Sequence, residues 1–174
     1  MIGWFNPETG QWDQARPKLP SYFLSVELVP TTCWYTNVRS NVTAREWEIC
    51  KNYVKTRSGA RCEICGGRGR KWPVECHEIW EYNDDRAIQT LVDLIALCPP
   101  CHEVKHIGRA MVMGNLDRAL RHLAKVNEWS LEDADHYVAA QLEVHALRST
   151  HPWTLDISWL DRVLGIKVVV KDRP

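Results

Sequence analysis

Two Cys-x-x-Cys pairs place the strongest constraint on how this chain folds. The first pair is CEIC (Cys62 and Cys65), which two glycines follow, and the second is CPPC (Cys98 and Cys101). A turn of this kind presents two thiolates from one tight loop, and zinc takes four such ligands at the corners of a tetrahedron. Redox Cys-x-x-Cys motifs are the alternative, but they rarely occur in pairs. The four cysteines are therefore predicted to bind one structural zinc ion.

The composition favours a folded protein inside the cell. The chain has 174 residues, and 45% of them are hydrophobic, which is enough to build a core. The sequence shows no membrane-spanning run and no signal-peptide pattern at its start, so we expect a cytoplasmic protein without membrane contact. Because that compartment is reducing, the seven cysteines favour metal binding over disulfides.

Three histidines beside the second cysteine pair indicate a second metal site. His102 and His106, in CHEVKH, are four residues apart, and residues at that spacing share one face of a helix. The two prolines before them suit the start of a helix. His77 lies in VECHEIW (74–80), whose alternation predicts a strand. A strand and a helix that converge here would hold a second divalent cation. Ordinary core or surface histidines, or alternate ligands of the zinc, are the other interpretations.

Together these motifs resemble the HNH endonucleases, the ββα-metal or His-Me finger family, in the branch that carries a four-cysteine zinc. That branch has CxxC, an E-x-H-H strand, a loop with an asparagine, and L-C-x-x-C-H-x-x-x-H. This chain has CEIC, ECHE, VDLIALC and LCPPCHEVKH over about residues 60–110. The resemblance implies hydrolysis of DNA phosphodiester bonds. It also implies that His77, His102 and His106 bind Mg²⁺ or another divalent ion, which stabilises the departing oxygen.

Two residues depart from the family pattern. Glu78 occupies the position of the general-base histidine, and Asp93 occupies that of the loop asparagine, where it would brace the loop by accepting backbone hydrogen bonds. A carboxylate with an ordinary pKa of about 4.3 is a weak base at neutral pH. In a shifted register His77 would be the base and Cys76 the ligand, but thiolates suit Mg²⁺ poorly. The residues that the resemblance implies for catalysis are His77, Glu78, Asp93, His102 and His106.

These departures leave a second function open, in which the chain is a catalytically inactive HNH-derived zinc module that binds DNA or a protein partner. DNA is the expected partner in either case, and RNA is the alternative. The charge pattern agrees, because residues 39–71 hold nine basic and three acidic side chains while residues 75–93 hold one basic and six acidic. Two solvated faces explain this pattern more simply. The candidates for contact with the DNA backbone are Arg45, Lys51, Lys55, Arg68, Arg70 and Lys71.

The expected fold class is α+β, with a ββα-metal core. Helices flank this core, and so does a small pairing of N- and C-terminal strands. We expect residues 1–58 to form an arm, a strand and a basic helix, residues 59–110 to form the HNH domain, and residues 111–174 to form a helical subdomain that ends in a strand. The predicted elements outside the site are a strand at 22–29, a helix at about 44–57 capped by Thr43 and Glu46, helices that begin after Asn115 and Ser130, a short helix between Asp156 and Gly165, and a strand at 166–171 that pairs with the first.

Overall fold

A three-stranded sheet forms the centre of the fold in the computed structural model, which describes the backbone of residues 4–6 and 11–13 and all atoms of residues 23–33 and 37–169. Strand β3 (Glu75–Asn83) pairs antiparallel with β4 (Ile88–Leu97), and β5 (Thr154–Asp156) pairs parallel with the other edge of β4. The register shifts once, so that Val92 is an extra residue on β4 and forms a β-bulge.

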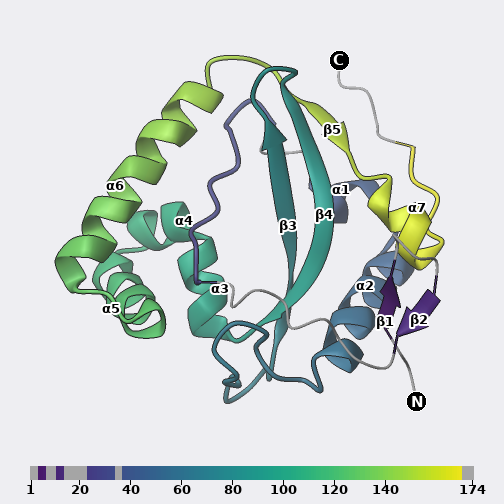
Figure 1. Cartoon of the computed structure of the whole chain (residues 1–174), viewed down its shortest axis with the longest axis horizontal. Coiled ribbons are helices and arrows are strands. Elements are labelled where there is room, and N and C mark those ends of the chain that lie inside the picture. Colours follow the sequence, from purple (N-terminus) through teal and green to yellow (C-terminus); the bar gives the residue numbers. More distant parts are fainter. Residues whose placement is uncertain (1–3, 7–10, 14–22, 34–36, 170–174) are drawn as a thin grey trace.

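Helices cover both faces of this sheet (Figure 1). One face carries α3 (Pro99–Lys105), α4 (Ile107–Val112), α5 (Leu116–Asn127) and α6 (Leu131–Arg148); the other carries α1 (Val38–Asn41), α2 (Ala44–Arg57) and α7 (Trp159–Leu164). The run from Leu94 to Leu97 is buried at every position because its side chains alternate between the two cores. Each half of the molecule therefore has its own apolar core, and the sheet separates them.

Local capping signals predicted the two longest helices correctly. Helix α2 begins after Thr43, whose side chain and that of Glu46 form the expected capping box, and α6 begins after Ser130 with the same arrangement involving Asp133. Helix α5 follows Asn115 as expected, and α7 ends as expected at Gly165, which has a left-handed conformation. The strand predicted at VECHEIW is also confirmed as β3.

The predicted pairing of N- and C-terminal strands is wrong for the residues that the structure describes. Residues 23–30 join no sheet and residues 166–169 form no strand, while Tyr22, Val170 and Lys171 lie outside the described residues. The segment 23–30 has the alternation of a strand because Leu24 and Val26 are buried against the helices. Its backbone, however, bonds to helical residues, as where the Leu24 N–H donates to the side chain of Asn127 over 2.7 Å. The alternating hydrophobic pattern therefore indicates that one side of the segment is buried, and it does not indicate a neighbouring strand.

Three short strands were not predicted. The parallel partner of β4 is β5, and the N-terminal arm contains an antiparallel pair of strands, β1 (Trp4–Asn6) and β2 (Gln11–Asp13). Each of these strands has three residues, too few to show a periodic pattern. In the part of the chain that the structure describes, no helix combines the length and apolar character needed to cross a membrane.

Candidate functional site

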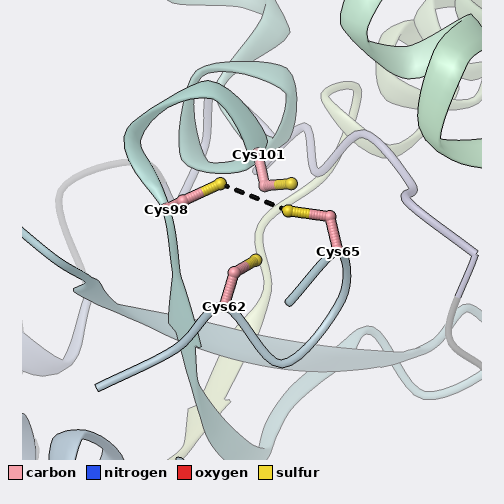
Figure 2. Close-up of side chains that lie close together, drawn as sticks. All are labelled: Cys62, Cys65, Cys98 and Cys101. Atoms are coloured by element: carbon pink, nitrogen blue, oxygen red, sulfur yellow. Dashed lines mark hydrogen bonds between the residues drawn. The ribbon is translucent and has the colours of Figure 1, made fainter. Parts of the chain in front are cut away.

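The four cysteines of the two Cys-x-x-Cys pairs converge at one point (Figure 2). Cys62 and Cys65 come from the turn that follows α2, while Cys98 and Cys101 come from the start of α3. All four sulfur atoms lie within 4.8 Å of one another, and the Sγ atoms of Cys65 and Cys98 are 3.5 Å apart. Only Cys65 is exposed. The cluster is compatible with a structural metal ion, and four thiols suit a soft tetrahedral ion such as zinc.

The first turn is built to close around an ion. The Cys62 N–H donates to the carbonyl of Gly67, and the Gly66 N–H donates to the carbonyl of Cys62, each over 2.9 Å. Gly66 has a φ of +71°, a conformation in which side chains other than glycine are strained. The Gly67 N–H points at Cys65 Sγ, 3.4 Å away. Such an N–H helps to stabilise a thiolate, so the turn is preorganised for metal binding.

The cysteine thiols also interact with one another. Hydrogen bonds to Cys101 and Cys98 hold the pKa of the Cys62 thiol well below its usual range, whereas hydrogen bonds to Cys62 and Cys98 raise the pKa of Cys101. A divalent ion would allow all four to ionise. Nε2 of His122, on α5, lies 3.1 Å from Cys101 Sγ and can support that charge as a hydrogen-bond donor.

The three predicted histidines form a second cluster. His77 comes from β3, His102 lies on α3, and His106 lies at the junction of α3 and α4. One ring nitrogen from each lies within 4.8 Å of the others. Nε2 of His102 and Nε2 of His106 are 3.1 Å apart, and the three ring centroids are separated by 4.6, 4.9 and 5.2 Å. Three imidazoles that face one another in this way can bind one metal ion.

Two carboxylates bond the outer sides of these histidines. Oε2 of Glu27 lies 2.9 Å from Nε2 of His77, and a carboxylate oxygen of Glu75 bonds to Nδ1 of His102. Metal-bound histidines commonly donate their second ring N–H to a carboxylate in this way. Burial, followed by the charges of His77 and His102, lowers the pKa of His106 to about 3, and burial lowers the pKa of His102 as well. Neutral imidazoles with a free lone pair are the form that binds metal.

Glu78 lies on the other face of the sheet from the three histidines. Side chains alternate along β3, so Glu78 shares the α2 side with Cys76 and Trp80, whereas His77 points toward α3. Burial raises the pKa of the Glu78 carboxyl. The raised pKa would suit a general base, but the carboxylate and the histidines project in opposite directions from the strand.

Asp93 lies within β4 and not in a loop. Its carboxylate receives two hydrogen bonds from Nη1 of Arg57, at 2.9 and 3.1 Å, and one from the backbone N–H of Leu94 at 2.7 Å. The bond from Leu94 is of the expected kind, since a backbone amide donates to the carboxylate. The main partner is nevertheless Arg57 at the end of α2, which connects this helix to the sheet.

The predicted DNA-contacting residues are exposed but fall into two groups. The first group lies on α2, across the sheet from the histidines, and consists of Arg45, Lys51 and Lys55; the second lies in the loop after the CEIC turn and consists of Arg68, Arg70 and Lys71. A side-chain carbon added at Gly69, within that loop, would lie 2.7 Å from Pro99 Cδ, so the loop packs closely on the start of α3. The loop group is thus attached to the helix that carries His102.

Comparison with known proteins identifies no relative: no family model, no curated protein and no solved structure matches this chain. The function must therefore be inferred from the geometry of the site. Sequence reasoning missed three of its members, namely Glu27, Glu75 and His122. Glu75 was detectable, because it precedes His77 by two residues and so shares its face of the strand. Glu27 and His122 are distant in sequence from the residues they contact, and no local pattern marks them.

Proposed function

We propose that this chain is an HNH-type endonuclease that hydrolyses DNA phosphodiester bonds with a divalent ion at the histidine cluster and a structural zinc at the cysteine cluster. One observation carries the proposal: His77, His102 and His106 present ring nitrogens within 4.8 Å of one another from a strand and a helix. A four-cysteine cluster at the start of the same helix supports it. Metal-ion hydrolysis of phosphodiesters needs a fixed ion of this kind beside the scissile phosphate.

The residues of the chain have separable roles in this proposal. The three histidines would hold Mg²⁺ or another divalent ion, which supplies stabilisation of the charge on the leaving oxygen. The cysteine cluster holds the start of α3 and thereby fixes His102. Arg68, Arg70 and Lys71 would contact backbone phosphates, which orients DNA without selecting a sequence.

A second function is favoured by the position of Glu78. Because Glu78 and His77 project from opposite faces of β3, the carboxylate is poorly placed to take a proton from water at the histidine cluster. A zinc-stabilised module that binds DNA or a protein without cutting would need no base at that position. Cleavage and binding must therefore be measured separately.

The deciding experiment is plasmid cleavage by the zinc-loaded protein in Mg²⁺, Mn²⁺ or Ni²⁺. Wild type is compared with His106→Ala and with His136→Ala, a matched control because His136 is an exposed histidine of α6 outside both clusters. We expect the His106 variant to lose cleavage and the control to retain it. If the wild type binds DNA but cleaves it with none of these metals, the nuclease proposal is wrong and the DNA-binding module is supported.

The proton-transfer residue requires two further variants. If Glu78→Ala abolishes cleavage while divalent-ion binding persists, Glu78 is the base despite its orientation. If Glu78→Ala does not reduce cleavage, the metal affinity of His77→Ala shows the role of His77. A large loss of metal affinity identifies His77 as a metal ligand, and an unchanged affinity identifies it as the general base.

A further inference from the structure

We propose that Glu27 is a positioning residue that fixes the tautomer and orientation of His77, so that the segment 23–30 completes the metal site. The proposal rests on the metal site of the proposed function, although not on nuclease activity. Glu27 precedes His77 by 50 positions in the sequence and lies outside the motifs at residues 60–110. A residue from the N-terminal segment would therefore decide how a ligand on β3 meets its ion.

The hydrogen bonds of His77 carry the argument. A carboxylate can only accept, so the 2.9 Å contact between Glu27 Oε2 and His77 Nε2 requires the ring proton on Nε2. A neutral ring then has its lone pair on Nδ1. That atom is buried and has no hydrogen-bond partner among the described residues. A buried acceptor without a partner is costly, and a metal ion would satisfy it.

The carboxylate of Glu27 is itself held in place from several sides. Its second oxygen, Oε1, accepts the backbone N–H of Trp80 over 2.9 Å, and the ammonium of Lys105 lies 3.6 Å from Oε2. Only 11% of the side chain is exposed. Glu27 is therefore held as a fixed acceptor beside His77.

The segment that carries Glu27 is anchored on the helices of the site. The Glu27 N–H donates to the carbonyl of Lys105 over 2.9 Å, and Lys105 Nζ donates to Ser25 Oγ over 2.8 Å. Asn127 of α5 bonds both the N–H and the carbonyl of Leu24, at 2.7 and 2.8 Å. Lys105 is the last residue of α3 and precedes His106 directly. The same backbone contact thus ties Glu27 to the histidine-bearing helix.

Glu75 interacts with His102 in the same way that Glu27 interacts with His77. The Glu75 carboxylate bonds Nδ1 of His102, and Nε2 of His102 faces His106. Two of the three histidines thus have one ring nitrogen on a carboxylate and the other left for the cluster. For His77 the nitrogen left for the ion is Nδ1, and for His102 it is Nε2.

The test measures Co²⁺ binding to the zinc-loaded protein by its visible absorbance. The absence of thiolate-to-cobalt charge-transfer bands verifies that zinc stays in the cysteine cluster. Glu27→Ala is expected to weaken Co²⁺ binding about 10- to 100-fold, the usual effect of losing such an outer partner. Glu27→Gln keeps one acceptor oxygen and is expected to lie between wild type and the alanine variant.

A matched control separates positioning from a general structural role. Gln89 is a fully buried polar side chain of β4 that bonds the hydroxyl of Tyr82 and belongs to neither cluster. Gln89→Ala should lower the melting temperature while leaving Co²⁺ affinity unchanged. Nitrogen-15 NMR of the His77 ring gives an independent readout: we expect the proton on Nε2 in the cobalt-free protein. A proton on Nδ1 would overturn the proposal.

The outcomes distinguish this proposal from the proposed function. Unchanged Co²⁺ affinity in Glu27→Ala overturns the role of Glu27 and leaves the nuclease in place. Weaker binding in Glu27→Ala, together with a wild type that binds Co²⁺ but cuts no DNA, supports Glu27 and overturns the nuclease. A wild type that binds no Co²⁺ beyond its zinc overturns both.

Discussion

Replacing Arg57 by alanine should destabilise the protein far more than replacing an exposed residue of α2. The guanidinium donates to both oxygens of Glu63 at 3.2 and 2.9 Å, to both oxygens of Asp93 at 2.9 and 3.1 Å, to the hydroxyl of Tyr53 at 3.3 Å and to the carbonyl of Leu94. Exposure of the three charged side chains is 11% for Arg57, 1% for Glu63 and 25% for Asp93. The variant therefore leaves two mostly buried carboxylates without this cation.

The magnitude follows from the cost of a buried charge that has lost its partner. Removing one member of a buried ion pair costs about 3–5 kcal/mol. For a chain of this size each kcal/mol lowers the melting temperature by about 2–4 °C, so we expect a decrease of about 6–20 °C. The loss extends to the cysteine cluster, because Glu63 lies inside the CEIC turn and accepts the N–H of Ala96 over 2.8 Å. The turn and β4 are thus linked through the same carboxylate.

The effect should also depend on pH in a defined direction. Burial already raises the pKa of Asp93 in the wild type, against the opposing charge of Arg57. Without Arg57 this pKa rises further, so the folded variant binds more protons than the unfolded chain. Its stability must then fall as pH rises from the ordinary carboxyl value of about 4, and the deficit relative to wild type should be larger at pH 7 than at pH 4.

Thermal and urea unfolding at fixed zinc concentration measure both effects. The matched control is Arg45→Ala, an exposed arginine on the same helix, for which a change within about 0.5 kcal/mol is expected. If Arg57→Ala destabilises no more than Arg45→Ala, the buried network does not hold α2 to the sheet. A deficit that grows as pH falls would contradict the assignment of the cost to unpaired carboxylates.

Three other predictions concern the cysteine cluster and the loop beside it. Elemental analysis should find zinc in the wild type and none in Cys101→Ser, and this variant should expose the amides of β4 and α3 to hydrogen exchange. His122→Ala removes the partner 3.1 Å from Cys101 Sγ and should weaken zinc binding about tenfold or more in competition with a chromogenic chelator. Gly69→Ala would place a carbon 2.0 Å from the carbonyl oxygen of Trp72 and should cost about 1–3 kcal/mol in urea unfolding. Gly108→Ala is its control, since the added carbon meets only the flexible end of Leu28 at 3.3 Å.

The sequence predicted those parts of the fold that short-range interactions determine. The capping boxes at Thr43 and Ser130 act within three residues, so they mark the starts of α2 and α6 without knowledge of the rest of the chain. The segment 23–30 was misassigned for the opposite reason. Its alternation is real, but whether an extended segment meets a strand or a helix depends on residues about 80 to 100 positions away, such as Lys105 and Asn127.

The candidate site shows the same difference between residues that are close in the sequence and residues that tertiary packing brings together. The cysteines and the three histidines lie in two short windows, so their types and spacing indicated that they would come together, as they do. No local sequence pattern marks most of the residues that surround them. Glu27 approaches His77 because the N-terminal segment bonds the end of α3, and Arg57 meets Asp93 because α2 packs on β4. Spacing along a chain indicates candidate ligands, whereas the partners that would orient them are set by tertiary packing.

His77 and Glu78 show how far a linear motif can mislead about proximity. They are adjacent in the sequence, yet the alternation of β3 sends one toward α3 and the other toward α2. His102, 25 positions from His77, has its ring 5.2 Å away. Metal binding requires only the side chains on the α3 face, whereas cleavage also requires a route for the proton. In the proposed function metal affinity and cleavage are therefore separable, and a protein that binds the ion without cutting DNA would need no change in the histidine cluster.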